Sequence, residues 1–327
     1  MINCVPKFKV EKLGPPSCGI VLAGGDGKRL QPFIDRLRGD RLPKQYMNFT
    51  GSRSMLEHTF RRAEKLIPSD FLFTVVNAPH LTFPGVRCQL SSRPRGSVII
   101  QPENKETGPG LLLPLIHLYK HYPESTVVVF PADHFIAEES LFMLHVEVAF
   151  RVVERNPSRL VLLGMAPRGA ESDYGYILPG QGIDSLLPLG IREISQFIEK
   201  PERSTAQTLI LNGGLWNTLV MIFKARTLLN LVRAYDPTLF SYFHRISEAI
   251  GTPGETDVLE EVYRQMEPVN FSQGILEPLS LQDPSPLWVL PVRGVHWSDW
   301  GSERRIMSGL QKTRRLGRLN GTLQIQA

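Results

Sequence analysis

The chain has 327 residues, of which 42% are hydrophobic and 21% are charged, a composition that predicts a globular fold and argues against disorder. Its three cysteines form neither a metal-ligand spacing nor an even disulfide set, so we expect free thiols in a reducing compartment and no zinc site. The formal net charge is +5 and no apolar run reaches about 18 residues, so we expect a cytoplasmic protein with no membrane partner.

The first predicted element is a buried strand, Cys18 to Ala23, which leads into a glycine-rich loop. The glycines of this loop are Gly24, Gly25 and Gly27. They would let backbone N–H groups reach a polyphosphate, to which Arg29 would add a forked cation. A dinucleotide fingerprint is excluded because Leu30 occupies the place of its third glycine, and a Walker A loop because arginine follows Gly-Lys. Judged alone, the segment fits a surface turn as well as a phosphate loop.

Positive charge is concentrated in two stretches of the chain. Residues 28 to 65 contain ten Lys or Arg against four Asp or Glu, and residues 303 to 318 contain six against one. An anionic ligand at the glycine loop would explain the first cluster, whereas the second is compatible with a solvated helix face. Nucleic acid is the competing explanation, but the basic residues are not interleaved with stacking aromatics, so we expect no nucleic-acid partner.

Strand and helix patterns alternate through the first half of the chain. Buried strands are expected at Phe71 to Asn77, Ser97 to Gln101, Thr126 to Pro131 and Leu160 to Met165. Ser54 and Glu57 form a capping box before one amphipathic helix, and residues 139 to 155 form another. The alternation predicts an α/β fold with a Rossmann-like, mostly parallel sheet, helices on both faces and ligands at the carboxyl ends of the strands.

The pattern changes after residue 170, where a smaller α+β lobe is expected to complete a pocket. Its extended pieces are Tyr174 to Leu178, Glu193 to Glu199 and Leu215 to Phe223, and its helices lie near 203 to 211, 225 to 235 and 255 to 266. Gly274 to Pro291, with four prolines, is expected to form an ordered surface loop. No linker rich in Pro, Gly or Ser separates the halves, so one composite domain is expected.

Two aspartates stand where a cation could be held. Asp133 follows the most apolar strand and either caps the next helix or holds a cation at the ligand edge of the sheet. Asp299 lies between two tryptophans and either bonds the backbone of its own turn or binds the same cation. Two carboxylates with phosphate oxygens would suit Mg²⁺, although spacing alone does not bring them together. The neighbouring His134 is assigned no catalytic role.

A further polar pair ends the strand predicted near residue 199. Glu199 and Lys200 form either an exposed ion pair or a ligand site in which Glu199 accepts sugar hydroxyls and Lys200 neutralises a phosphate. The residues alone leave both alternatives open.

Eight motifs, taken in order, make the chain resemble a known enzyme family. They are Leu22-Ala-Gly-Gly-Asp-Gly-Lys-Arg-Leu30, Pro43-Lys-Gln45, Gln101-Pro-Glu-Asn-Lys-Glu-Thr-Gly-Pro109, Pro131-Ala-Asp-His134, Tyr174-Gly-Tyr-Ile177, Phe197-Ile-Glu-Lys-Pro201, Gly214-Leu-Trp-Asn217 and Trp297-Ser-Asp-Trp-Gly-Ser302. In this order they resemble the sugar-1-phosphate nucleotidyltransferases, and among these the bacterial mannose-1-phosphate guanylyltransferases. Together the motifs are far more specific than any one of them.

The resemblance implies a role for each matching residue. It assigns nucleotide binding to Ala23, Gly24, Gly25, Gly27, Gln101 and Thr107. It assigns sugar-phosphate binding to Gly175, Glu199, Lys200 and Asn217. It makes Arg29, Lys44 and Asp133 catalytic, with Asp133 and Asp299 as the ligands of Mg²⁺.

The resemblance also implies a reaction, in which mannose-1-phosphate attacks the α-phosphorus of GTP and yields GDP-mannose and pyrophosphate. Because the sugar phosphate is already anionic near pH 7, alignment and charge neutralisation suffice and no general base is needed. A homodimer is compatible with the family. The alternatives are another sugar-1-phosphate or nucleoside triphosphate, or a non-catalytic nucleotide-sugar-binding regulatory protein, and the complete set of charged residues argues against the last of these.

Several positions depart from the family pattern and leave the sugar and the nucleobase open. Lys28 stands where the glycine loop usually has threonine, and Thr-Leu follows Asn217 where Ser-Gly is usual. Trp300 follows Asp299 where valine is usual, and residues 104 to 108 differ from the usual Gly-Arg-Asn-Thr-Ala.

Three segments are expected along the chain: an N-terminal extension at residues 1–17, a nucleotidyltransferase domain at 18–310 and a basic tail at 311–327. Only 25 residues follow the last motif, too few for the β-barrel or β-helix that some relatives carry, so a catalytic domain alone is expected.

Overall fold

The structure is a computed structural model in which residues 17–312 are described. The predicted N-terminal extension, residues 1–17, and the predicted basic tail, residues 311–327, lie outside this range except for residues 17, 311 and 312. Within residues 17–312 no helix is both long and apolar enough to cross a bilayer.

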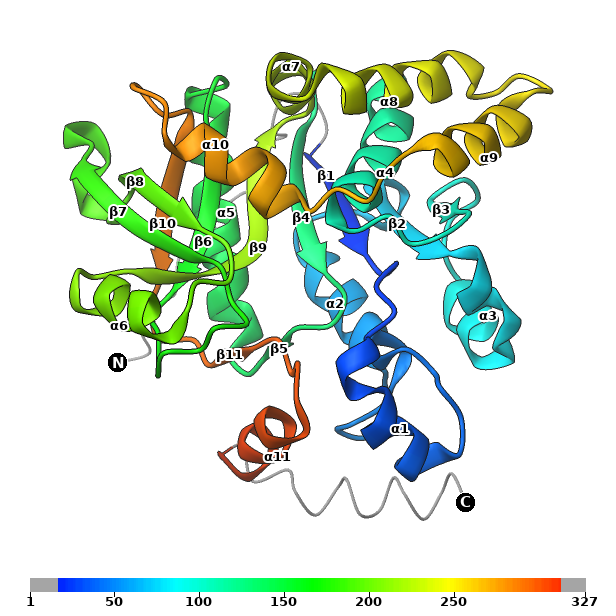
Figure 1. Ribbon diagram of the computed structural model, residues 1–327, viewed down its shortest axis with the longest axis horizontal. Coiled ribbons are helices and arrows are strands. Elements are labelled where there is room, and N and C mark those ends of the chain that lie inside the picture. Colours follow the sequence, from blue (N-terminus) through cyan, green and yellow to red (C-terminus); the bar gives the residue numbers. More distant parts are fainter. Residues whose placement is uncertain (1–16, 313–327) are drawn as a thin grey trace, which may run out of the picture.

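One half of a nine-stranded sheet is parallel. Its strands are β1 (Ser17–Leu22), β2 (Leu72–Asn77), β3 (Val98–Gln101) and β4 (Thr126–Pro131), in the order β3-β2-β1-β4. Every neighbouring pair among them is parallel, which confirms four of the strands predicted from sequence. Their continuous apolar runs are typical of a parallel sheet covered on both faces. The glycine loop leaves the sheet at the carboxyl end of β1 (Figure 1).

The other half of the sheet is mainly antiparallel and contains the extended pieces predicted for the α+β lobe. The prediction of a mostly parallel sheet is wrong in extending that sheet to Leu160–Met165, which an antiparallel strand separates from β4. The strands of this half are β6 (Leu160–Met165), β7 (Tyr176–Gly182), β8 (Arg192–Ile198), β9 (Leu215–Lys224) and β10 (Leu287–Val292). They continue from β4 in the order β9-β6-β10-β8-β7, and β9 pairs again with β7, which closes these strands on themselves. The late strand β9 enters between β4 and β6 and pairs antiparallel with both, an insertion that the order of elements along the chain does not reveal.

Helices cover both faces of the sheet (Figure 1). One core packs against α1 (Gln31–Arg38), α2 (Met55–Ala63), α3 (Pro84–Leu90), α5 (Glu139–Arg155), α6 (Arg203–Leu211) and α11 (Glu303–Lys312). The other packs against α4 (Thr107–His121), α7 (Ala225–Tyr235), α8 (Pro237–Ala249) and α9 (Glu255–Gln265). Strand β4 serves both cores, because Val128 and Phe130 face the first and Val127 and Val129 the second.

The capping box predicted before α2 is present. The hydroxyl of Ser54 accepts a hydrogen bond from the backbone N–H of Glu57, whose carboxylate accepts one from the N–H of Ser54. Two of the N–H groups that a helix start leaves unpaired are thereby satisfied, which fixes where α2 begins.

The prediction of a surface loop from Gly274 to Pro291 is wrong. The segment contains a turn at Ser272–Leu276, the short helix α10 (Glu277–Ser280) and the buried strand β10, which lies inside the sheet between β6 and β8. Pro278 is tolerated because it occupies the first turn of α10, where its missing N–H costs nothing. Pro291 lies near the end of β10, beyond the residues that pair with β8.

A separate two-stranded ribbon lies beside the main sheet (Figure 1). Its strands are β5 (Phe135–Ile136) and β11 (Trp297–Ser298), which pair antiparallel. Asp133 lies two residues before β5, and Asp299 directly follows β11. The ribbon therefore brings together the two aspartates that are 166 positions apart in the sequence.

Candidate active site

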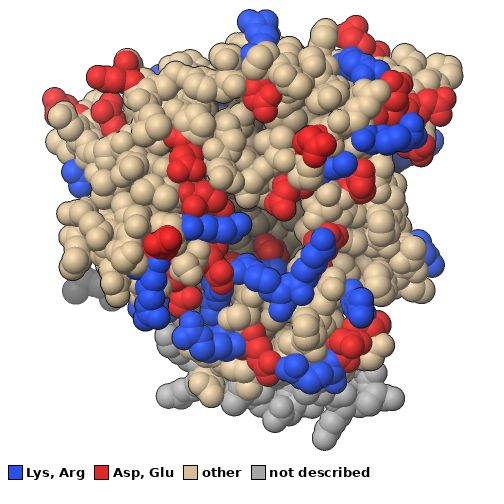
Figure 2. Space-filling model, viewed as in Figure 1, with Lys and Arg blue, Asp and Glu red and all other residues tan. Residues whose placement is uncertain are grey.

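A cavity of about 260 Å³ lies at the carboxyl ends of β1 and β4, between the two halves of the sheet. Ten of the predicted site residues line it: Gly25, Gly27, Arg29, Lys44, Thr107, Asp133, Gly175, Glu199, Asn217 and Asp299. The remaining four, Ala23, Gly24, Gln101 and Lys200, do not. The face seen in Figure 2 is hollowed near its middle, with charged side chains of both signs around the hollow.

Lys44 joins the two aspartates. It sits in a short 3₁₀ turn, Lys44–Tyr46, and its side chain is only 8% exposed. Its ammonium lies 2.9 Å from Oδ2 of Asp133 and donates a hydrogen bond of 2.7 Å to the backbone carbonyl of Asp299. Burial raises the pKa of Asp133, but Lys44, through its charge and hydrogen bond, together with His134 and a backbone hydrogen bond outweighs burial. The pKa of this carboxyl therefore falls below its ordinary value. Asp133 is therefore held as a carboxylate, and it does not cap α5, which begins at Glu139.

Asp299 is held from three sides through one oxygen. Its Oδ1 accepts hydrogen bonds from the hydroxyl of Tyr174 at 2.6 Å, from Arg305 at 3.1 Å and from the backbone N–H of Gly301 at 3.0 Å. The hydrogen bond from Gly301 is the bond to the backbone of its own turn that the sequence gave as one alternative for Asp299. Its Oδ2 lies 3.8 Å from Arg29, so this second oxygen is the one that a ligand could contact.

The sequence missed three residues that hold this side of the cavity. Arg29 forms a 2.7 Å ion pair with Asp173, and Asp173 also pairs with Arg305. Burial and the nearby Asp299 raise the pKa of Tyr174, which keeps its hydroxyl a hydrogen-bond donor. Tyr174 begins one of the eight motifs and Asp173 directly precedes it, so their position was the available signal. Nothing in the spacing indicated Arg305, which comes from α11.

The glycine loop has open space where a ligand would lie. Gly27 has φ 62°, a left-handed conformation that favours glycine. A Cβ on Gly25 would meet no protein atom within 4 Å. Packing of the core therefore does not require a glycine here, and the missing side chain leaves room in the cavity. The loop is fixed from below by Gln45, whose amide nitrogen donates to the carbonyls of Ala23 at 2.8 Å and Gly25 at 2.7 Å.

Gln101 and Gly24 act behind the loop. A Cβ on Gly24 would approach the amide nitrogen of Gln101 to 2.5 Å, so this glycine is needed for packing against Gln101. Gln101 is buried and its amide donates to the side chain of Asn77. Asn77 and Asn104 in turn each donate a 3.1 Å hydrogen bond to Asp26 of the loop. These contacts tie the glycine loop to the segment that the sequence predicted on the nucleobase side.

The antiparallel half supplies the other wall. Gly175 packs so closely that a Cβ there would lie 2.6 Å from Oε2 of Glu199 and 3.4 Å from Cβ of Asn217. Burial raises the pKa of Glu199, and the ion pair with Lys200, 3.5 Å away, only partly offsets it. Lys200 itself is half exposed and has φ 47°, with its N–H bonded to the carbonyl of Tyr174. Its ammonium therefore acts on the cavity through Glu199.

The donor set of the cavity fits a hard cation held jointly with a ligand. Among residues 17–312 no group of three or more His, Cys, Asp or Glu side chains has metal-binding geometry. Two carboxylates, Asp133 and Asp299, nevertheless line one cavity and are bridged by Lys44. Mg²⁺ is commonly bound through one or two carboxylates, with phosphate oxygens and water completing its coordination.

Comparisons with known proteins identify the family of the chain. Residues 18–314 match the protein family described as Nucleotidyl transferase. The chain is 28% identical over 243 residues to mannose-1-phosphate guanylyltransferase 2 of Escherichia coli O157:H7, an alignment that covers 72% of this chain and 48% of that protein. It is 28% identical over 221 residues to the xanthan biosynthesis protein XanB of Xanthomonas campestris pv. campestris (strain B100), covering 67% and 44%. The chain thus spans about half the length of these curated relatives.

A solved structure shares most of the fold. A protein of Thermus thermophilus described as a mannose-1-phosphate geranyltransferase superposes with a TM-score of 0.73 and 25% identity, over 89% of this chain and 79% of that one. The mixed α/β architecture with its two-part sheet is therefore found in a protein of related description.

Proposed function

The chain belongs to the nucleotidyl transferase family, and we propose that it transfers a guanylyl group from GTP to mannose-1-phosphate, giving GDP-mannose and pyrophosphate. One observation carries this proposal: a single cavity is lined by the glycine loop on one side and by Gly175, Glu199 and Asn217 on the other. Lys44 stands between the two aspartates at its centre. The choice of mannose and guanine rests on the relatives, and the nucleotidyl transfer itself on the cavity and the family.

The reaction requires alignment more than proton transfer. A phosphate oxygen of the sugar-1-phosphate forms a bond to the α-phosphorus of the triphosphate, and the bond from that phosphorus to the bridging oxygen of pyrophosphate breaks. The attacking oxygen is already anionic near pH 7, since the second pKa of a phosphate monoester is about 6. No side chain needs to remove a proton, and the lowered pKa of Asp133 keeps that carboxyl ionised.

The residues of the cavity have distinct tasks under this proposal. Backbone of the glycine loop receives the triphosphate, and the Lys44 ammonium neutralises charge at the reacting phosphate while keeping Asp133 and Asp299 in place. Arg29 is half exposed and paired with Asp173, so it can shift part of its hydrogen bonding to a phosphate when one arrives. Glu199 and Asn217 orient the sugar through its hydroxyls.

Asp133 and Asp299 would hold the metal ion. When bound, Mg²⁺ would supply a positive charge that offsets the charge developing on the phosphate oxygens. The two aspartates fit this task because both line the cavity and because Asp133 is kept ionised.

One assay tests the proposal. The purified chain is incubated with Mg²⁺, each of the four common nucleoside triphosphates and a panel of sugar-1-phosphates, and pyrophosphate release is measured with and without EDTA. We expect release that requires both substrates, is highest with GTP and mannose-1-phosphate, and stops when EDTA is added. If pyrophosphate release is highest with another pair of substrates, that pair replaces GTP and mannose-1-phosphate in the proposal. If no pair gives release, a non-catalytic nucleotide-sugar-binding protein is favoured.

A further inference from the structure

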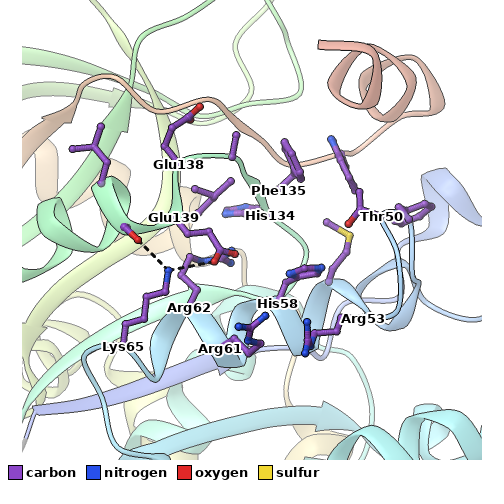
Figure 3. A pocket seen from close by; sticks show the side chains of 17 residues that line it. Thr50, Arg53, His58, Arg61, Arg62, Lys65, His134, Phe135, Glu138 and Glu139 are labelled. Carbon is purple, nitrogen blue, oxygen red and sulfur yellow. Dashed lines mark hydrogen bonds and ion pairs between the residues drawn. The ribbon is translucent and has the colours of Figure 1, made fainter. Parts of the chain in front are cut away.

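A second cavity, larger than the first, lies on the far side of the β5–β11 ribbon. Its volume is about 600 Å³, within the usual range of small-molecule sites. Helix α2 and the segment before it form one wall, and β5 with the start of α5 forms the other (Figure 3). Trp300 also lines it. None of the residues assigned to the proposed active site lines this cavity.

Four cations line the cavity on and beside α2. Arg61 and Arg62 lie in the last turn of the helix, Lys65 lies two residues after its end, and Arg53 lies two residues before its start. Figure 3 shows these side chains along α2, with Phe135 and Glu138 across from them. Four of the ten Lys and Arg residues between positions 28 and 65 thus line this cavity, whereas only two, Arg29 and Lys44, line the active-site cavity. An anion at the glycine loop therefore does not account for the whole cluster.

Acidic partners are too few for these cations. Glu139 is shared, lying 3.4 Å from Arg62 and 3.5 Å from Lys65. Glu138 accepts a hydrogen bond of 2.6 Å from the backbone N–H of His296. Arg53 and Arg61 are exposed and form no ion pair with any of the residues that the structure describes. The cavity therefore carries an excess of positive charge.

One of the positive charges of the cavity, that of Arg62, is buried. Its side chain is 2% exposed, and its Nη2 donates to the hydroxyl of Thr59 at 2.9 Å. Its Nε has no hydrogen-bond partner among residues 17–312, although buried donors are normally paired. Burial lowers the pKa of Arg62 to about 10, so the group remains a cation at neutral pH. Because Arg62 lines the cavity, its guanidinium adds to the positive charge that an anionic occupant would meet.

The remaining lining is apolar. Phe49, Met55, Phe135, Ile136 and Leu141 contribute to it. A small inorganic anion would leave this surface unused, whereas a phosphate group attached to a ring-shaped body could contact both parts.

The cavity shares its ribbon with the proposed active site. His134, which directly follows Asp133, lines both cavities, and Trp300 directly follows Asp299. Phe135 stacks on Trp300 with ring centroids 4.5 Å apart. Trp300 has φ 45°, a conformation that costs energy for a bulky residue and is held only by its surroundings. A molecule that shifts Phe135 or Trp300 would therefore shift the adjoining aspartates.

We propose that the second cavity binds a small phosphomonoester with a ring-shaped body and that its occupation changes turnover at the active site through the β5–β11 ribbon. The binding part stands on the cavity alone, and the part about turnover rests on the proposed function. A nucleoside monophosphate and a hexose phosphate share this chemistry.

Isothermal titration calorimetry on the full chain tests the binding. The probes are GMP, mannose 6-phosphate and inorganic phosphate, with guanosine and mannose as unphosphorylated controls. The variant is Arg53→Ala/Arg61→Ala, which removes two exposed cations of the cavity. The matched control is Arg95→Ala/Arg155→Ala, which removes two exposed arginines that lie outside the cavity.

We expect GMP or mannose 6-phosphate to bind more tightly than inorganic phosphate, and the unphosphorylated controls not to bind. The cavity variant should weaken binding about tenfold or more, while the control variant and Lys44→Met leave it unchanged. Binding that is lost in Lys44→Met but kept in the cavity variant would place the probe in the active site and overturn the proposal. Absence of binding by every phosphorylated probe would overturn it as well.

Pyrophosphate release then tests the coupling. The bound probe should change kcat at least about twofold in the wild type and the control variant but not in the cavity variant, since a ligand shifts an equilibrium only through its differential affinity. Binding without any change in kcat would overturn the coupling. If no substrate pair reacts at all, the proposed function fails while the titration result stands.

Discussion

The two halves of the sheet build the candidate site in different ways. In the parallel half, Gly25 and Asp133 sit on loops that directly follow β1 and β4, where parallel strands end at a common edge. In the antiparallel half, Gly175 precedes β7, Glu199 follows β8 and Asn217 lies within β9. The parallel half positions ligands by strand direction, whereas the antiparallel half depends on close packing between neighbouring strands.

The contrast extends to what each glycine does. Gly25 has open space beside it, so the loop is shaped for a ligand. Gly175 is enclosed by Glu199, Phe197 and Asn217, so its missing side chain makes room for protein. From this difference we expect substitutions in the parallel half to act mainly on the nucleotide and those in the antiparallel half on the sugar phosphate and on stability.

The largest effect should come from the ribbon, on which both halves depend. Asp133→Asn or Asp299→Asn removes a carboxylate while keeping the side-chain shape, and we expect kcat to fall about 1,000-fold. The Tm should fall by a few degrees, because each substitution weakens charge-assisted hydrogen bonds that the carboxylate accepts, while the protein stays folded. Pyrophosphate release and thermal unfolding measure the two quantities. Asp35→Asn on the exposed face of α1 serves as control, and near-normal turnover in either site variant would contradict the metal assignment.

Lys44→Met should reduce kcat about 100-fold, because it removes the cation that joins the two aspartates. The matched control is Lys224→Met, since Lys224 is also shielded from solvent and lies 2.8 Å from an acidic partner, Glu154, outside the active-site cavity. We expect the control to lower the Tm and leave kcat intact. Equal kcat in the two variants would show that Lys44 serves only the fold.

Two glycine variants sharpen the comparison of the halves directly. Gly25→Ala should raise the KM for the nucleotide about tenfold and leave the Tm unchanged, since its Cβ meets no protein atom. Gly175→Ala should lower the Tm by about 5 °C and raise the KM for the sugar phosphate, since its Cβ would overlap Glu199. Steady-state kinetics with each substrate varied in turn measure the two KM values. A raised KM for the sugar phosphate in Gly25→Ala and for the nucleotide in Gly175→Ala would contradict the comparison.

On the sugar side, Glu199→Gln should raise the KM for the sugar phosphate about tenfold and leave the KM for the nucleotide unchanged, because it weakens hydrogen bonds to the sugar hydroxyls. Lys200→Ala should have a smaller effect in the same direction, since its ammonium acts through Glu199. A larger effect of Lys200→Ala would mean that this lysine reaches the phosphate itself.

The smallest effect is expected at Lys28. Its side chain is 82% exposed, and its ammonium is 3.8 Å from Asp26, a distance at which an exposed pair contributes little. Lys28→Thr should change the KM for the nucleotide less than about threefold, measured at two ionic strengths. A larger, salt-dependent increase would show that Lys28 contacts the triphosphate.

Local patterns in the sequence were enough for the parallel half. The strands ending at Leu22, Asn77 and Pro131 and the capping box of Ser54 and Glu57 follow from periodicity and helix-start chemistry, both of which act over a few residues. The aspartates could be singled out because they stand in motifs. That they lie in one cavity depends on a ribbon of two residues per strand, too short to give a periodic signal.

The remaining features depend on contacts between distant segments. The prolines in and before β10 are turn signals and predict a loop, whereas pairing with Leu160–Met165 makes the segment a strand. The hydrogen bond from Tyr174 to Asp299 joins residues that are 125 positions apart in the sequence. The hydrogen bond from Arg305 links α11 to the residue that follows β11. The excess of Lys and Arg between residues 28 and 65 is evident in the sequence, but the second cavity is not, because its opposite wall comes from β5 and α5.

The central claim is that one cavity catalyses the reaction between a nucleotide bound by the parallel half and a sugar phosphate bound by the antiparallel half. The most direct measurement follows α-³²P-labelled GTP incubated with mannose-1-phosphate and Mg²⁺, with wild type and Asp133→Asn side by side. We predict that the label moves into GDP-mannose with one pyrophosphate released per product in the wild type, and hardly at all in the variant. Label that stays in GTP, or that moves equally in both proteins, would contradict the claim.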